Sequence, residues 1–138
     1  MISPEKLLSQ INILTVDDME AIRSMISGVL RNMGATNVEV AINGEAAWKT
    51  INSKRIDLII CDWDMPKMTG IELLQKIRES VEFKHIPFLL LTATTERERV
   101  LAAVKAGVTD YLSKPFQPKE LEYRVIKMLG KVDLDRKP

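Results

Sequence analysis

Short apolar segments alternate with amphipathic segments along almost the whole chain, and this alternation restricts the fold more than any other feature. Ile11–Val16 is the first apolar run, and apolar side chains then recur at helical spacing as far as Met33. Gly34 follows, where a helix C-cap is favoured. The same order recurs four times. Further strands are expected at Val38–Ile42, Asp57–Cys61, Pro87–Leu91 and Asp110–Leu112, with helices at Glu45–Asn52, from Thr69, at Glu96–Ala106 and from Pro118.

Strands that alternate with helices through short links favour a parallel sheet, because right-handed crossovers place the helices on both faces. We therefore expect a doubly wound α/β fold with five parallel strands. The 138 residues suffice for one compact domain, which we expect at residues 11–130. Residues 1–10 look like an N-terminal extension and residues 131–138 like a polar C-terminal tail.

Charge and composition exclude several classes of function. Twenty Lys and Arg oppose nineteen Asp and Glu, so the net charge of +1 indicates neither a nucleic-acid partner nor an anionic membrane surface. No apolar run approaches the roughly 20 residues that cross a bilayer. Cys61 is the only cysteine and cannot form an internal disulfide, which is typical of a reducing compartment. We expect a cytoplasmic protein without membrane insertion.

Polar side chains stand where four of the expected strands end: Asp17 and Asp18, then Asp62, Thr92 and Lys114. The carboxyl ends of parallel strands share one edge of the sheet, where ligands of this fold class bind. Two carboxylates about 4 Å apart repel by roughly 4 kcal/mol at an effective dielectric near 20, so a cation is needed there. Oxygen ligands with room for water and phosphate favour Mg²⁺ over a caged Ca²⁺, with Mn²⁺ as a substitute. Phosphoryl transfer to an ionised aspartate needs positioning and charge neutralisation more than a general base.

The joint spacing of several motifs resembles the receiver domain of two-component response regulators, and within it the single-domain chemotaxis regulators. The motifs are Val16-Asp17-Asp18, Asp62-Trp63-Asp64-Met65-Pro66 with Gly70, Thr92-Ala93, Tyr111 and Lys114-Pro115-Phe116. The resemblance covers essentially the whole chain. It implies a flavodoxin-like sheet of strand order 2-1-3-4-5 and a switch that assists its own phosphorylation and dephosphorylation without being an enzyme.

The resemblance also implies a role for each site residue. Asp62 would be the phosphoacceptor. Asp18 and Asp62 would bind the metal directly, the Asp64 backbone carbonyl would be a further ligand, and Asp17 would hold the ion through water. Thr92 and Lys114 would contact the phosphoryl oxygens, and Thr92 and Tyr111 would form the switch pair. One departure concerns Asp64, which is asparagine in the best-studied chemotaxis regulators. Its side chain and Thr94 would influence how fast the phosphate hydrolyses.

The implied output surface is formed by the helix at Glu96–Ala106, the last strand and the final helix. Its expected residues are Arg97, Val100, Val104, Tyr111, Arg124 and Lys127, although charges on helices commonly form a solvated face. A sensor histidine kinase would be the phosphodonor, and a phosphatase could act on the product. A flagellar motor switch protein or another protein target would bind the switched surface.

Plainer interpretations exist for single residues. Asp17 alone would more often be a helix cap. Cys61 precedes Asp62 on one strand and should face the opposite side as a core thiol. His85 is the only histidine and is expected at the surface.

Three other functions compete with this interpretation. Asp62-Trp63-Asp64 partly matches the nucleophile motif of haloacid-dehalogenase phosphatases, but Pro66 and the position on the third strand depart from it. A flavodoxin-like cofactor binder would need a phosphate loop after the first strand, where Asp17 and Asp18 instead repel phosphate. The chain could also be the receiver part of a longer regulator or of a pathway other than chemotaxis.

Overall fold

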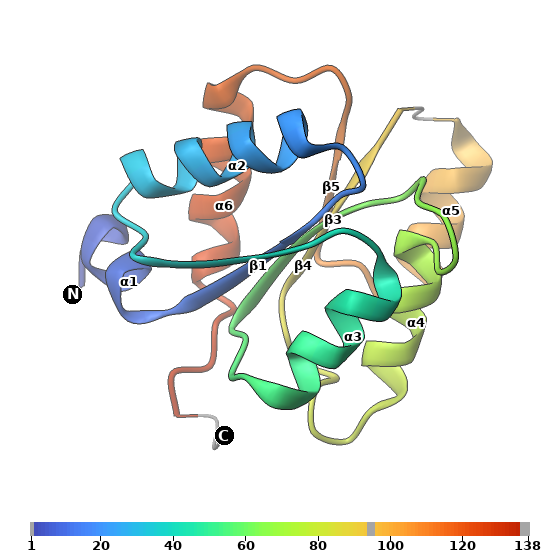
Figure 1. The fold of residues 1–138 in the computed structure, drawn as a ribbon, viewed down its shortest axis with the longest axis horizontal. Helices are drawn as coiled ribbons and strands as arrows, with labels where there is room; N and C mark the ends of the chain where they lie inside the picture. Colours follow the sequence, from blue (N-terminus) through green and yellow to red (C-terminus); the bar gives the residue numbers. More distant parts are fainter. Residues whose placement is uncertain (1, 94–95, 136–138) are drawn as a thin grey trace.

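The computed structural model describes residues 2–93 and 96–135. Five parallel strands form one sheet in the order β2-β1-β3-β4-β5, which confirms the expected doubly wound α/β fold (Figure 1). The strands are β1 (Asn12–Val16), β2 (Asn37–Ala41), β3 (Leu58–Asp62), β4 (Phe88–Thr92) and β5 (Asp110–Ser113). The helices are α1 (Pro4–Gln10), α2 (Glu20–Asn32), α3 (Gly44–Ser53), α4 (Gly70–Glu79), α5 (Arg97–Lys105) and α6 (Pro118–Leu129).

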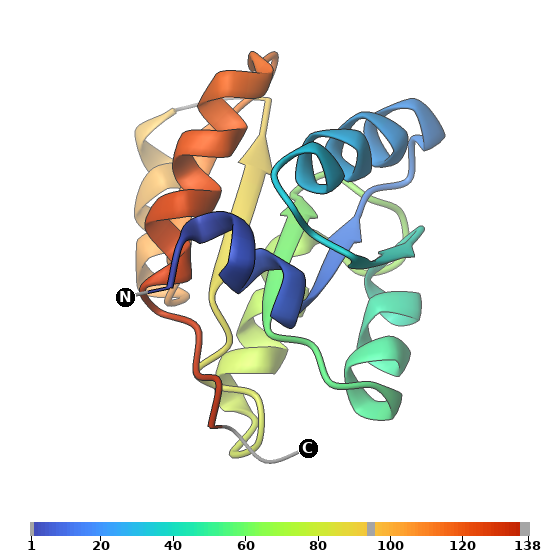
Figure 2. The same cartoon turned by 90° about the vertical axis from the view of Figure 1, so that its left-hand side faces the viewer.

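The helices form two layers, with α2 and α6 on one face of the sheet and α3, α4 and α5 on the other (Figures 1 and 2). Alternate residues of each buried strand serve the two layers, as the pleat of a strand requires. In β3, Ile59 and Cys61 pack with α3 and α4, whereas Leu58 and Ile60 pack with α2 and α6. Both faces of the central strands are therefore covered, which explains their almost unbroken apolar sequence.

Helix α1 was not predicted from the sequence. Its N-cap is Ser3, whose side chain accepts a hydrogen bond from Lys6 N, and Pro4 occupies the first turn, where proline is favoured. Leu8 and the following Ile11 are fully buried in the α2–α6 layer. Because the helix has only seven residues and one fully buried side chain, it leaves no detectable apolar period.

Arg78 joins the C-terminal end of α4 to the two loops that lead into β4 and β5. Its guanidinium donates to the carbonyl oxygens of Gly107 at 2.8 Å, Lys84 at 3.1 Å and Ile86 at 2.7 Å, and to Thr109 Oγ1 at 3.3 Å. Burial lowers the pKa of Arg78. One side chain thus satisfies several backbone acceptors at the edge of the sheet where the strands begin.

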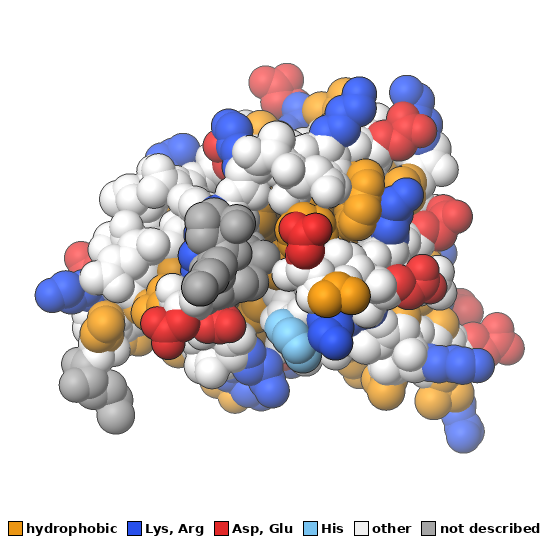
Figure 3. All heavy atoms as spheres, turned by 90° about the horizontal axis from the view of Figure 1, so that it is seen from below, with side chains coloured by type: hydrophobic (Ala, Val, Ile, Leu, Met, Phe, Trp, Pro, Cys, Tyr) orange, Lys and Arg blue, Asp and Glu red, His pale blue; other side chains and the backbone are white. Residues whose placement is uncertain are grey.

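The surface agrees with the nearly balanced net charge. On the face shown in Figure 3, acidic and basic side chains of the described residues are interspersed, with apolar side chains between them. Among the described residues, no helix is long and apolar enough to cross a membrane.

Candidate functional site

The carboxyl edge of the sheet places the expected site residues through backbone pairing. Val16 pairs with Cys61 in the sheet register, so Asp17 and Asp62 leave neighbouring strands at the same level. Pairing continues beyond the strand ends, because Asp17 N donates to Ala41 O at 3.1 Å and Lys114 N donates to Thr92 O at 2.8 Å. These bonds fix the backbone from which the polar side chains extend.

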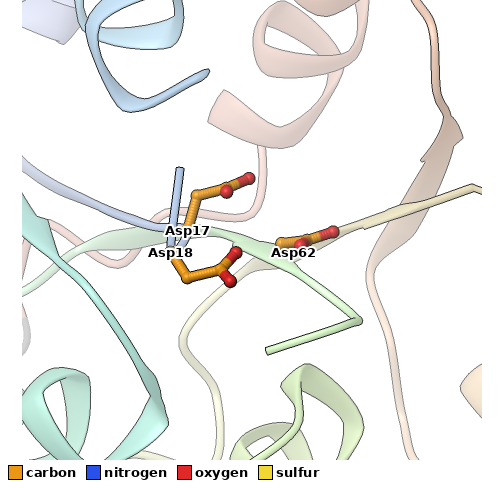
Figure 4. A group of neighbouring side chains, drawn as sticks. All are labelled: Asp17, Asp18 and Asp62. Carbon is orange, nitrogen blue, oxygen red and sulfur yellow. The ribbon is translucent and has the colours of Figure 1, made fainter. Parts of the chain in front are cut away.

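Three carboxylates meet at this edge. Asp17, Asp18 and Asp62 each offer a carboxylate oxygen, and these oxygens all lie within 4.8 Å of one another. Figure 4 shows the side chains extending from the ends of the adjacent strands β1 and β3 into the same space. Asp17 and Asp62 are buried, whereas Asp18 is exposed. Hard oxygen donors at this spacing, with one side open to solvent, suit a divalent cation such as Mg²⁺.

Asp17 also caps the turn that follows it. Its Oδ1 accepts a hydrogen bond from Met19 N at 2.9 Å, while its Oδ2 lies 3.2 Å from Lys114 Nζ. The two carboxylate oxygens therefore serve different partners. The N-cap of α2 is Met19, which has no side-chain cap, so the alternative interpretation of Asp17 as the helix cap is wrong.

Lys114 supplies the positive charge of the pocket. Its Nζ lies 3.0 Å from Asp62 Oδ1 in addition to its contact with Asp17. Burial lowers the pKa of Lys114, but the hydrogen bonds and charges of Asp62 and Asp17 outweigh burial and leave that pKa raised. Lys114 is therefore protonated at neutral pH.

The ionised carboxylate of Asp62 is less stable in this pocket than that of an exposed aspartate. Burial raises the pKa of Asp62 and outweighs the hydrogen bond and charge of Lys114, which lower it. The nearby charges of Asp17 and Asp64 raise it further. Lys114 therefore offsets only part of the cost of ionising Asp62 in this buried position.

The loop between β3 and α4 folds back onto the end of β3. Gly70 N donates to Trp63 O at 2.9 Å, and a Cβ at Gly70 would collide with Asp62 O. Thr69 caps α4 by accepting from Glu72 N, and Glu72 accepts from Thr69 N in return. Lys67 takes a positive φ of 68° within this loop. Glycine at position 70 thus allows the helix start to approach the backbone of Asp62.

Thr92 and Tyr111 lie on neighbouring strands. Thr92 ends β4, one residue beyond the Leu91 that pairs with Asp62, and Tyr111 pairs with Leu90. Thr92 is buried and Tyr111 half-buried. Both line a narrow crevice under α5, whose walls are Trp63, Thr92, Arg99, Val100, Ala103 and Tyr111. Thr94, expected beside the phosphate path, lies outside the described residues.

Arg99 was not expected at the site, because a charged residue on a helix usually belongs to a solvated face. Its guanidinium pairs with both carboxylate oxygens of Asp64, at 2.9 and 3.1 Å, and its Nη1 lies 3.4 Å from Thr92 Oγ1. The sequence offered one signal. A cation in the first turn of a helix is unfavourable next to the positive end of the helix dipole, so an acidic partner elsewhere in the fold would stabilise it.

The expected output residues lie over α5, β5 and α6 but differ in exposure. Arg97 and Lys127 are exposed, and Val104 is 62% exposed, whereas Val100 is half-buried. Arg124 is instead held by Asp110, with both carboxylate oxygens 3.0 Å from its Nη1. Three further exposed apolar side chains on these helices were not expected: Leu101, Tyr123 and Ile126.

The structure places the remaining single residues as expected. Cys61 is fully buried among apolar side chains, and burial raises the pKa of its thiol well above the usual value. His85 is exposed in the link before β4.

Together, these features define a doubly wound α/β domain in which three carboxylates, able to hold a divalent cation, and a lysine meet at the carboxyl edge of the sheet. A family model described as the response regulator receiver domain matches residues 13–126. The chain belongs to this receiver-domain family, as its sequence motifs indicated.

Curated relatives and solved structures agree with this assignment. The chemotaxis protein CheY of Pseudomonas aeruginosa is 38% identical over 121 residues, which span 88% of this chain and 98% of that protein. CheY-3 of Vibrio cholerae is 37% identical, over 87% of this chain and 92% of that protein. The structure of CheY4 of Vibrio cholerae matches with a TM-score of 0.81 at 35% identity, over 86% of this chain and 98% of that one.

A further solved relative concerns the metal. The receiver domain of a sensor histidine kinase from Pseudomonas aeruginosa, described with a magnesium ion coordinated in its active-site cleft, matches with a TM-score of 0.78 at 28% identity. The match covers 87% of this chain and 98% of that one. Membership of the receiver family makes this chain a signalling switch and implies a histidine kinase as phosphodonor and a downstream target.

Proposed function

We propose that the chain is a phospho-accepting response regulator of a chemotaxis-like two-component pathway and that Asp62 accepts the phosphoryl group. The observation that carries this proposal is the position of Lys114 Nζ, 3.0 Å from Asp62 Oδ1 and 3.2 Å from Asp17 Oδ2. A fixed cation beside a buried, ionisable acceptor provides the charge neutralisation that phosphoryl transfer requires. We place the functional unit at residues 11–130, in the cytoplasm.

In the proposed transfer, a carboxylate oxygen of Asp62 forms a bond to phosphorus while the bond from phosphorus to the kinase histidine nitrogen breaks. The nitrogen keeps the electron pair of that bond, and the product on Asp62 is an acyl phosphate. Lys114 and the Thr92 hydroxyl donate hydrogen bonds to phosphoryl oxygens. No general base is needed, because the attacking carboxylate is already ionised.

Mg²⁺, or Mn²⁺ in its place, would be held by the carboxylates of Asp18 and Asp62, by the backbone carbonyl of Asp64 and by Asp17 through water. When bound, the ion supplies positive charge between the carboxylates and the incoming phosphoryl oxygens. The close approach of the three carboxylates supports Asp17, Asp18 and Asp62 as the acidic part of this ligand set.

The phosphorylation state would be transmitted through Thr92 and Tyr111. Both residues line the same narrow crevice under α5, so a displacement of Thr92 when the phosphoryl group is bound would reach the tyrosine ring. Such a switch acts by favouring one of two conformations of the α5–β5–α6 surface. The exposed residues Leu101, Val104 and Tyr123 would then contribute apolar contacts to a protein target.

Incubation with acetyl phosphate and Mg²⁺, followed by intact-mass measurement, tests the central step. We expect one added phosphate that depends on Mg²⁺ and is absent in Asp62→Asn. Asp64→Asn separates this function from a haloacid-dehalogenase-like phosphatase, because a receiver retains the adduct whereas a phosphatase loses turnover. The absence of a magnesium-dependent adduct on Asp62 would rule the proposal out.

A flagellar motor switch protein is the first target to test, and a target in another pathway or a phosphatase is the alternative. Binding should tighten when acetyl phosphate and Mg²⁺ are present and should weaken in Val104→Asp. Val81→Asp is a suitable control, because Val81 is 84% exposed in the link between α4 and β4, away from the proposed surface. Equal affinity with and without phosphorylation would exclude that protein as the output target.

A further inference from the structure

Arg99 lies across the rim of the acidic pocket and connects three parts of the fold. It belongs to the first turn of α5, yet it pairs with Asp64 in the loop after β3 through two N–H···O contacts of 2.9 and 3.1 Å. Its Nη1 also lies 3.4 Å from Thr92 Oγ1 at the end of β4. The guanidinium carbon stands 4.5 Å from the centre of the Trp63 ring.

These contacts restrict the geometry of Arg99 more than a single surface ion pair would. The guanidinium plane matches the carboxylate of Asp64 in a fork, and it lies over the face of Trp63. The hydrogen bond with Asp64 raises the pKa of Arg99, and the charge of Asp62 contributes in the same direction. The side chains of Arg99 and Asp64 are 31% and 55% exposed, so the pair contributes little to stability.

The position of the pair matters because of the chemistry next to it. Asp62 is only 5% exposed, and Arg99 contacts Thr92 beside it, so the Arg99–Asp64 pair flanks one of the sides from which water reaches a phosphoryl group on Asp62. Hydrolysis of the acyl phosphate requires that water to attack phosphorus in line with the Asp62 oxygen. The water oxygen bonds to phosphorus, the bond to Asp62 breaks with return of the carboxylate, and the water protons go to inorganic phosphate and solvent.

We propose that Arg99 and Asp64 form a clasp over the pocket that restricts this attack and sets the lifetime of phosphorylated Asp62. The inference rests on the proposed function and assigns Arg99 as a positioning residue that acts through Asp64. While the clasp is closed, the carboxylate of Asp64 is engaged by Arg99 and cannot orient an attacking water. Without Arg99, the rim opens and the carboxylate becomes available to that water.

The lifetime is tested by loading the protein with acetyl phosphate and Mg²⁺, removing the donor and following the loss of phosphate by intact mass. Arg99→Gln should shorten the half-life by roughly two- to fivefold, the effect expected for loss of one exposed charge-assisted pair. Arg99→Lys should not restore the lifetime, because an ammonium cannot form the fork. Lys105→Gln removes one positive charge from the other end of α5 and should leave the half-life unchanged.

The double variant Arg99→Gln with Asp64→Asn shows whether the two residues act as a unit. In the Asp64→Asn background, replacement of Arg99 should change the half-life by less than twofold, because the clasp is already broken. An unchanged half-life in Arg99→Gln overturns the inference. The same acceleration in both backgrounds also overturns it, because Arg99 would then act without Asp64.

A second readout requires neither phosphate nor metal. In a Trp48→Phe background, Trp63 is the only tryptophan, and its fluorescence reports whether the guanidinium covers the ring. Arg99→Gln and Asp64→Asn should both shift the emission to longer wavelength, whereas Lys105→Gln should not. Unchanged spectra in the first two variants refute the clasp even where phosphorylation succeeds. A spectral shift without any Asp62 adduct in the unsubstituted protein would leave the clasp standing and reject the proposed function.

Discussion

Lys114 Nζ lies 3.0 Å from Asp62 Oδ1, although the two residues lie far apart in the sequence. The contact is possible because β3 and β5 flank β4, and all three strands end at the same edge of the sheet. Lys114 also lies 3.2 Å from Asp17 Oδ2, so two buried carboxylates share one ammonium group. The first two predictions follow from this arrangement.

Replacing Lys114 with Met should lower the free energy of unfolding by roughly 1–3 kcal/mol in metal-free buffer, because Asp17 and Asp62 lose their cation. Mg²⁺ should narrow the difference, because it stabilises the folded state and binds more tightly where Lys114 no longer competes for Asp17 and Asp62. Chemical denaturation with and without Mg²⁺ measures both effects. Lys54→Met is the control, because the Lys54–Glu39 pair is exposed and should contribute little. Equal losses in the two variants would contradict this account.

Replacing Asp62 with Asn should raise the melting temperature of the metal-free protein at neutral pH. The raised pKa of Asp62 means that the folded state binds this proton more tightly than the unfolded state. The destabilisation by ionised Asp62 is therefore fully present above that pKa, and it is relieved as the pH falls through it toward the unfolded value.

The difference in melting temperature between Asp62→Asn and the unsubstituted protein should therefore become smaller as the pH is lowered. Melting curves over a pH series measure this difference. Asp57→Asn provides the contrast, because Asp57 pairs with Arg55 and accepts from Asn12 N and should lose stability. A melting temperature of Asp62→Asn below that of the unsubstituted protein at neutral pH would refute this prediction.

Replacing Gly70 with Ala should destabilise the protein by roughly 1–3 kcal/mol, the usual result of forcing atoms into a packed site. The new methyl group would collide with the Asp62 carbonyl and lie 3.0 Å from Leu90 Cδ1. We expect slower formation of the Asp62 adduct as well, because the acceptor backbone must move. Gly28→Ala in α2 should instead stabilise by about 1 kcal/mol, since nothing lies within 4 Å of its added carbon. We expect the denaturation midpoint of Gly70→Ala to lie below that of the unsubstituted protein and the midpoint of Gly28→Ala to lie above it.

Replacing Thr15 with Val should stabilise the protein by about 1 kcal/mol, because a buried hydroxyl without a partner costs free energy. Thr15 is fully buried, and its Oγ1 has no hydrogen-bond partner among the described residues. Thr109→Val should have the opposite effect, since Thr109 Oγ1 accepts from Phe88 N at 2.9 Å and contacts Arg78. Calorimetry of both variants separates the effect of the hydroxyl from that of packing, because a packing effect of valine would change the melting temperature in the same direction in each variant.

The sequence predicted the fold well because each central strand is apolar on both faces and each helix repeats its apolar side chains. Those patterns are local and can be read within ten residues. Asp17, Asp62 and Lys114 could be related to one another because parallel strands bring their carboxyl ends to one edge. Arg99 and Arg78 could not be assigned, because their partners lie in other loops and leave no local pattern. Helix α1 was missed because its stability comes from packing of Leu8 and Ile11 rather than from a repeat.

The contacts of Arg78 have a mechanical consequence for α5. Gly107 follows the end of α5, and its carbonyl is held by Arg78 on α4, so the C-terminal end of α5 is tethered to the rest of the domain. The other end carries Arg99, which ends at the acidic pocket. We therefore expect α5 to pivot about its C-terminal end, near Gly107. A small displacement at the pocket would then tilt the helix and reorient Leu101 and Val104 on the surface without loosening the sheet.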